Sequence, residues 1–218
     1  MLLVNLAREL FETWRLPEAA DYAERAYAKA QRAGDEIVVG QALSVRTHIH
    51  RDRGQLEQCE AVLTELAAHW QRILPSGHGA FASLASHYAK LALARGDIPA
   101  ALAASDQAIT LATASGAGRD ALPMFLIPRA GIELRAGRLE EALTTVIKAI
   151  ALEETIAGSE AQSCWVGRAQ LTKGRILAAQ GQRELARTAF ALAREHLQLT
   201  VGADHPETRE AIQGAAAQ

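Results

Sequence analysis

The fold is decided by a short phrase, Arg53-Gly54-Gln55-Leu56, which returns along the chain. The later copies read Arg95-Gly96-Asp97-Ile98, Ala136-Gly137-Arg138-Leu139 and Gln180-Gly181-Gln182-Arg183. Successive glycines are 42, 41 and 44 residues apart, and a degenerate copy, Trp14-Arg15-Leu16, lies 40 residues before the first, with tryptophan in place of glycine. Five copies with one period indicate a repeat array, in which each copy is one supersecondary unit.

Each copy predicts two helices separated by a turn at the glycine. Apolar and small residues precede the turn at spacings of three and four, as at Leu3, Leu6, Ala7 and Leu10, which is the periodicity of an amphipathic helix. Glycine ends that helix because it adopts the left-handed backbone conformation at little cost. The second helix carries a small residue five positions after the turn, at Ala19, Cys59, Ala101, Ala142 and Ala186. Small side chains there let neighbouring helices approach closely, and alanine makes up about a fifth of the chain.

The array is expected to fill the whole chain as a single domain. The predicted repeats cover residues 1–34, 35–76, 77–117, 118–159 and 160–202, followed by a terminal helix over 205–216. Asp204 or His205 would cap that helix and Pro206 would lie in its first turn. The sequence thus predicts an all-α fold, an α-α superhelix of about five helix-turn-helix repeats and a C-terminal helix. That last helix either covers the apolar end of the stack or belongs to a longer array.

The repeats resemble the tetratricopeptide repeat (TPR) family, whose motif has the glycine turn followed by small residues. Repeat four carries Gly137, Leu139 and Ala142 at these places, whereas Arg46, Arg129 and Lys173 stand where the motif has leucine. The long period, together with Leu199-Thr-Val-Gly-Ala-Asp-His-Pro-Glu-Thr208, is similar to a kinesin-light-chain-like bacterial subgroup. This resemblance implies a right-handed solenoid that serves as a non-enzymatic protein-interaction scaffold. The alternative it implies is a regulatory or sensor segment of a larger bacterial signalling protein, such as a kinase, an ATPase or a transcription regulator.

The resemblance also implies that the first helix of each repeat lines a concave groove. The positions that would face it are Asn5, Arg8, Gln41, Ser44, His48, Arg51, Ser83, His87, Lys90, Arg135, Arg168 and Arg175. Glu12 and Asp52 are the acidic residues on this face, and Phe11 or Phe81 would supply an apolar pocket beside it. Arginine matches the geometry of carboxylates and phosphates, so the expected guest is an acidic or C-terminal peptide segment. The alternative is a charged helix face that is simply solvated.

Composition and charge exclude other classes of partner. The net charge of −2 lacks the basic excess of a general nucleic-acid binder. No apolar run approaches the roughly 20 residues of a membrane span. Two cysteines, Cys59 and Cys164, do not make a disulfide framework, so the cytoplasm is the expected compartment. Self-association would occur through the open ends of the array.

No set of residues predicts catalysis, a cofactor or a metal. His48 and His50 lie two residues apart on a predicted helix, which rotates them by roughly 200° away from a common ion. Cys59 stands where the repeats require a small residue, so its thiol is interpreted as a packing residue, and Cys164, beside Trp165, is interpreted as a packing or surface residue. The sequence therefore predicts a protein that binds and does not catalyse.

Overall fold

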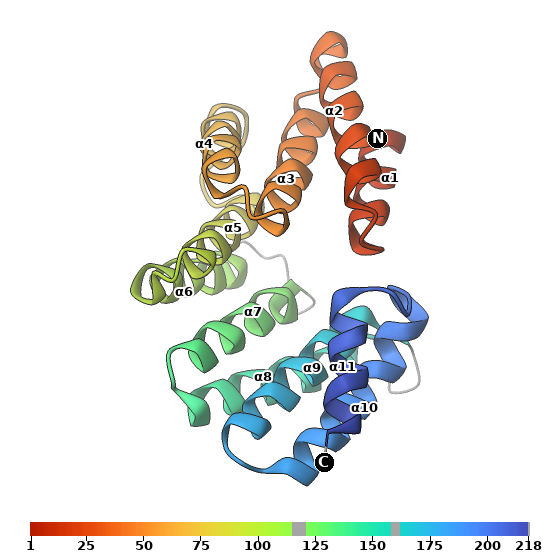
Figure 1. Ribbon diagram of the computed structural model, residues 1–218. Coiled ribbons are helices and arrows are strands. Elements are labelled where there is room, and N and C mark those ends of the chain that lie inside the picture. Colours follow the sequence, from red (N-terminus) through yellow and green to blue (C-terminus); the bar gives the residue numbers. More distant parts are fainter. Residues whose placement is uncertain (115–120, 158–161, 218) are drawn as a thin grey trace. The chain divides into compact units, whose positions relative to one another are not determined.

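Eleven α-helices make up the part of the chain that the computed structural model describes, which is residues 1–114, 121–157 and 162–217 (Figure 1). In chain order they are α1 (Leu2–Glu12), α2 (Leu16–Ala33), α3 (Glu36–Asp52), α4 (Leu56–Ile73), α5 (Ala80–Ala94), α6 (Ile98–Ala114), α7 (Leu122–Arg135), α8 (Leu139–Ala157), α9 (Cys164–Ala179), α10 (Arg183–Thr200) and α11 (Pro206–Ala216). These ranges contain no strand. The predicted all-α fold of five helix-turn-helix repeats and a terminal helix is confirmed.

The recurring phrase forms the turn inside each repeat. Gly54, Gly96, Gly137 and Gly181 all have φ between 71° and 79°, which is the left-handed region. Trp14 takes the same conformation with φ 61°, and the Arg15 N–H donates to the Leu10 carbonyl at 2.8 Å, as the Gln55 N–H does to His50 at 2.9 Å. A residue with a Cβ pays roughly 1–2 kcal/mol for this conformation. The degenerate first copy therefore has the same turn geometry as the others.

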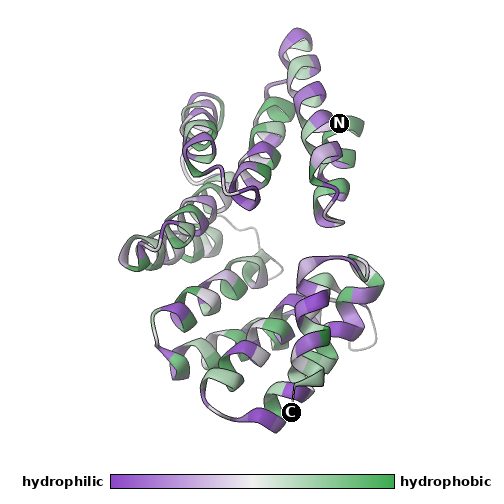
Figure 2. Cartoon of the chain, viewed as in Figure 1, coloured by the Kyte–Doolittle hydropathy of each residue, from purple (hydrophilic) through white to green (hydrophobic). Residues whose placement is uncertain are grey.

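The small residues of the repeats lie where helices meet. Ala19, Cys59, Ala101, Ala142 and Ala186 are all buried, with at most 4% of their surface exposed. Apolar and polar residues are mixed along the helices (Figure 2). The buried residues of α2 and α10 recur every three or four positions, so these helices bury one face and present another to solvent. No helix among the described residues is both long enough and apolar enough to cross a membrane.

The chain divides into two compact units, Met1–Leu111 (unit 1) and Ala112–Gln218 (unit 2). In unit 1, α1 packs on α2, α2 on α3, α3 on α4 and α4 on α5, while the first helices also meet, α1 with α3 and α3 with α5. Its core is closed by Trp70 of α4, whose ring lies directly over Gly40 of α3. A β-carbon at Gly40 would lie 2.1 Å from the Trp70 ring, so glycine is required there.

Unit 2 is built in the same way from α7 to α11. Each helix packs on the next, and α9 also contacts α7 and α11. Phe190 of α10 is buried between two glycines, Gly174 of α9 and Gly214 of α11, where β-carbons would come within 2.8 Å and 2.5 Å of its ring. The terminal helix begins after His205, whose side chain accepts the Glu207 N–H at 3.2 Å.

The predicted repeat boundaries at 34/35 and 76/77 fall in turns between helices. Those at 117/118 and 159/160 lie outside the described residues. A single continuous domain over 1–218 and self-association through its ends stay predictions.

Candidate interaction surface

A chain of rings joins the first helices of the three repeats in unit 1. Phe11 of α1 lies 5.2 Å from His48 of α3, measured between ring centroids, and His48 meets His87 of α5 edge to face at 4.5 Å. The pairs form because α3 packs between α1 and α5 and because positions 48 and 87 are separated by close to one repeat period. We call Phe11, Ser44, His48, Arg51, His87 and Lys90 the imidazole cluster.

His87 is the buried centre of this cluster. Only 6% of the residue is exposed, and its Nε2 lies 2.9 Å from the Ser44 hydroxyl. Its Nδ1 is buried without a hydrogen-bond partner. Burial first, and then the positive charges of Lys90 and Arg51, lower the pKa of His87 to about 3. The imidazole is therefore neutral at physiological pH, and one of its nitrogens is buried without a hydrogen bond.

The low pKa of His87 predicts a loss of stability in mild acid. The unfolded chain binds this proton below about pH 6.5, whereas the folded chain binds it only near pH 3. Its stabilising contribution is therefore complete above pH 6.5 and is lost as the pH falls from there toward 3. As the pH falls from about 7.5 to about 5, protonation of His87 in the unfolded chain should lower the free energy of unfolding by about 2 kcal/mol. Urea unfolding across that range should show a shallower pH dependence in His87→Gln, and an unchanged dependence would contradict the assignment.

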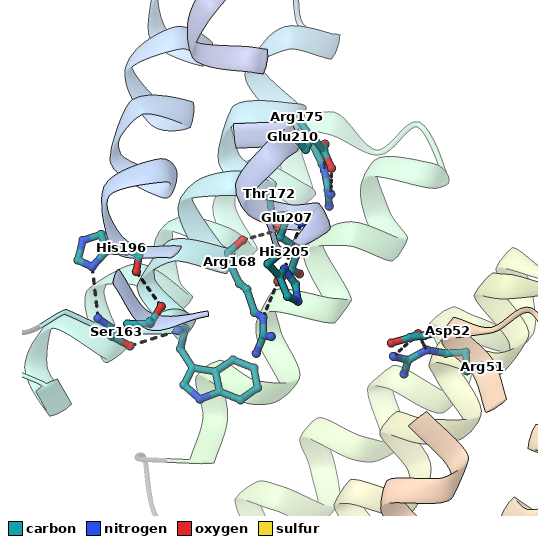
Figure 3. A network of polar contacts seen from close by, with 12 residues as sticks. Arg51, Asp52, Ser163, Arg168, Thr172, Arg175, His196, His205, Glu207 and Glu210 are labelled. Carbon is teal, nitrogen blue, oxygen red and sulfur yellow. Dashed lines mark hydrogen bonds and ion pairs between the residues drawn. The ribbon is translucent and has the colours of Figure 1, made fainter. Parts of the chain in front are cut away.

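The positive charges of the cluster are partly compensated. Arg51 donates from Nε to Asp52 at 2.6 Å (Figure 3). Its Nη1 lies 3.3 Å from Nδ1 of His48. Lys90, which is half-buried, follows His87 by almost one helical turn on α5. Arg51 and Lys90 both place positive charge beside His87, and that favours an anionic group near this imidazole.

The remaining predicted groove residues of unit 1 lie on the same helices. Asn5 and Arg8 of α1 are exposed, and Gln41 of α3 and Ser83 of α5 are half-buried. Five of the predicted groove residues thus lie close together in the structure: Ser44, His48, Arg51, His87 and Lys90.

The predicted basic residues of unit 2 have internal counterions. Arg168 donates from Nε to Glu207 at 2.9 Å, and Arg175 makes two bonds to Glu210, at 2.6 Å and 2.5 Å (Figure 3). Both glutamates belong to α11, three residues apart, so they share one face of that helix. Sequence reasoning missed these pairs because the partners are 39 and 35 residues apart. Arg135, at the end of α7, is exposed.

Unit 2 also places a serine, a histidine and a glutamate together. The Ser163 hydroxyl accepts the N–H groups of Trp165 and Val166, and so caps α9, while it lies 3.4 Å from a carboxylate oxygen of Glu153. His196 accepts the backbone N–H of Ser163 at 3.3 Å and does not contact its hydroxyl (Figure 3). The Ser163 hydroxyl donates to Glu153 and not to His196, and the two N–H groups that it accepts cap the first turn of α9.

The first thiol has a packing role in the core of unit 1. Cys59 is fully buried, its thiol donates to the Thr47 carbonyl at 3.4 Å, and burial raises its pKa. Cys164, the first residue of α9, is half-buried and unoxidised. Within the described ranges, no group of three histidines, cysteines or carboxylates could hold a metal ion.

Comparison with known proteins agrees with this architecture. The model of the tetratricopeptide repeat family matches residues 82–107, within α5 and α6. Among solved structures, BtubC (BKLC) from P. vanneervenii is 18% identical, with a TM-score of 0.69 over 92% of this chain and 81% of that one. The chain has the TPR-like repeat fold. A protein from P. anserina assigned as a kinesin light chain, with nearly identical TPR-like repeats, is also 18% identical, with a TM-score of 0.60 over 91% of this chain and 94% of that one.

No curated protein sequence matches the chain. Proteins with TPR-like repeats generally serve as scaffolds for protein interactions and are generally not catalysts. The TPR-like helix pairs of unit 1 place the imidazole cluster on first helices, the ones that the sequence resemblance assigned to the binding face.

Proposed function

We propose that this chain is a non-enzymatic protein-interaction module whose imidazole cluster binds an acidic peptide segment of a partner. The observation that carries the proposal is the buried Nδ1 of His87, which lacks a partner beside two cations. A buried polar atom without a hydrogen bond is unfavourable by about 1–3 kcal/mol. A peptide group that reaches this nitrogen would remove that penalty.

Other residues of the imidazole cluster complement the chemistry of an acidic peptide. Ser44 can either donate to or accept from Nε2 of His87, so the imidazole can present Nδ1 as acceptor or as donor. Lys90 and Arg51, the latter paired with Asp52, supply the positive potential that attracts a carboxylate. Phe11, packed near His48, supplies an apolar surface for a neighbouring side chain. The proposed segment is therefore acidic with an adjacent apolar residue.

In unit 2, Arg168 and Arg175 are excluded from this proposal as first contacts, because Glu207 and Glu210 already bind them. Reversing the charge of Arg175 would place a new carboxylate beside Glu210 and disturb α11. A clean test of binding therefore changes residues of unit 1.

The test selects peptides from a displayed random library against the full chain and measures their affinities by calorimetry. We expect an excess of Asp and Glu in the selected peptides. The double variant Arg51→Glu/Lys90→Glu should weaken their binding by about tenfold or more. Lys29→Glu/Arg32→Glu, an equal change of charge at two exposed positions of α2, should leave it unchanged. Selected peptides without acidic excess, or equal affinity for Arg51→Glu/Lys90→Glu, would overturn the proposal.

A further inference from the structure

A hollow of about 410 Å³ opens in unit 1, away from the residues of the imidazole cluster. It lies where α2 ends, α3 begins and the last turns of α4 pass, and Ala30 and Val39 form its apolar part. Its polar lining consists of Tyr27, Gln31, Glu36, Glu65, His69 and Arg72. The volume is within the range of about 300–1,000 Å³ that is usual for small-ligand sites.

One wall of the hollow is a closed, neutral network. His69, 8% exposed, donates from Nε2 to the Glu36 backbone carbonyl at 2.7 Å, and its Nδ1 accepts from Arg72 at 3.2 Å. Arg72 also forms two bonds to the Glu36 carboxylate, at 3.2 Å and 2.9 Å, which lower the pKa of Glu36. The charges of Arg72 and Glu36 cancel, and both nitrogens of the imidazole have hydrogen-bond partners. This wall leaves no charge for a ligand.

The opposite wall positions a second carboxylate. The Tyr27 hydroxyl donates to Oε1 of Glu65 at 2.5 Å and accepts from the Gln31 amide at 2.8 Å. This hydrogen bond raises the pKa of Tyr27, so the phenol remains a donor. Arg46 covers the Tyr27 ring at 4.9 Å but is paired with Glu24 at 2.7 Å. The wall is therefore held in place, and Glu65 carries the charge left over around the hollow.

We propose that this hollow is a second binding site, for a single cationic group of the alkylammonium or guanidinium class. Glu65 would accept a charge-assisted hydrogen bond from that group. Ala30 and Gln31 lie in the last turn of α2, whose carbonyl end carries a partial negative charge that also favours a cation. Val39 and Ala30 contact the alkyl part of the ligand. Such a group could be a lysine or arginine side chain of a partner protein, or a free amine.

The test titrates the isotope-labelled full chain by NMR and follows the backbone amides of Gln31 and Gly34. The probes are N-acetyl-lysine methylamide and N-acetyl-arginine methylamide, with 1,4-diaminobutane as a free amine and N-acetyl-norleucine methylamide as a neutral control. We expect saturable shifts with the cationic probes and none with norleucine. Tighter binding of the blocked amino acids would assign the site to a partner's side chain, and tighter binding of the diamine to a free amine.

Variants separate the site from non-specific attraction of cations. Glu65→Gln should weaken binding by about tenfold or more, whereas Glu57→Gln, the same change at an exposed position of α4, should leave affinity as in the wild type. Tyr27→Phe keeps the charge of Glu65 but removes the hydroxyl that positions it, and should weaken binding less. Thermal melting checks that each variant is folded. No saturable shift with any cationic probe, or equal affinity of Glu65→Gln and the wild type, would overturn the proposal.

Discussion

Phe190→Ala is expected to lower the free energy of unfolding of unit 2 by about 4 kcal/mol. The ring fills the space between α9 and α11 because Gly174 and Gly214 have no side chains there. Neither glycine has a side chain that could fill the space of the lost ring. Truncation of Phe190 therefore leaves a cavity. Alanine also removes the contact that holds α11 against α10.

Chemical denaturation and hydrogen exchange of the α11 amides would measure this effect. The hydrogen exchange rates of the α11 amides should rise most, because Phe190 packs directly against Gly214 of that helix. Leu192→Ala, on the same helix but 40% exposed, is the matched control and should lower stability by far less. If both variants lost the same stability, the packing of Phe190 between the two glycines would not be what holds α11.

Gly40→Ala is expected to destabilise unit 1 by about 3 kcal/mol. The new β-carbon would lie 2.1 Å from the Trp70 ring, so that α3 and α4 must separate or the ring must leave the core. In an open helix the same change normally stabilises by up to about 1 kcal/mol, because alanine has the better helix propensity. We therefore expect the Trp70 ring, which supplies the three nearest atoms, to reverse the sign of the effect.

The control for this prediction is Gly131→Ala in α7, where nothing lies within 4 Å of the added carbon. It should be neutral or slightly stabilising in the same urea titration. A double-mutant cycle with Trp70→Leu adds a second readout, because Gly40→Ala should lose most of its effect once the ring is gone. Full destabilisation in the Trp70→Leu background would show that another contact requires the glycine.

The repeat pattern predicted the turns and the helix contacts because both depend on local chemistry. A left-handed turn favours glycine, so the regular spacing of glycines along the sequence predicts these turns without knowledge of the tertiary structure. The four turn glycines are Gly54, Gly96, Gly137 and Gly181. The same period identified the buried small residues. It also identified Trp14 as a turn residue, although no rule of composition favours tryptophan at positive φ.

The candidate sites were less predictable because they depend on how helix faces meet. The resemblance placed His48 and His87 on first helices, but their edge-to-face contact and the unpaired nitrogen follow from the packing of α3 on α5. Arg168 was predicted to face a guest, and the structure supplies Glu207 instead. The close approach of Trp70 to Gly40 has one signal in the sequence. A glycine inside a helical pattern can mark a place where another group packs close to the helix backbone.

The ion pairs of α11 have a consequence for selectivity. Glu207 and Glu210 are tethered beside Arg168 and Arg175, so they act as a built-in competitor whose effective concentration is on the order of millimolar. An acidic peptide reaches these arginines only if its own affinity outweighs that local supply of carboxylate. A ligand that offered charge alone would therefore compete poorly with Glu207 and Glu210 for these arginines.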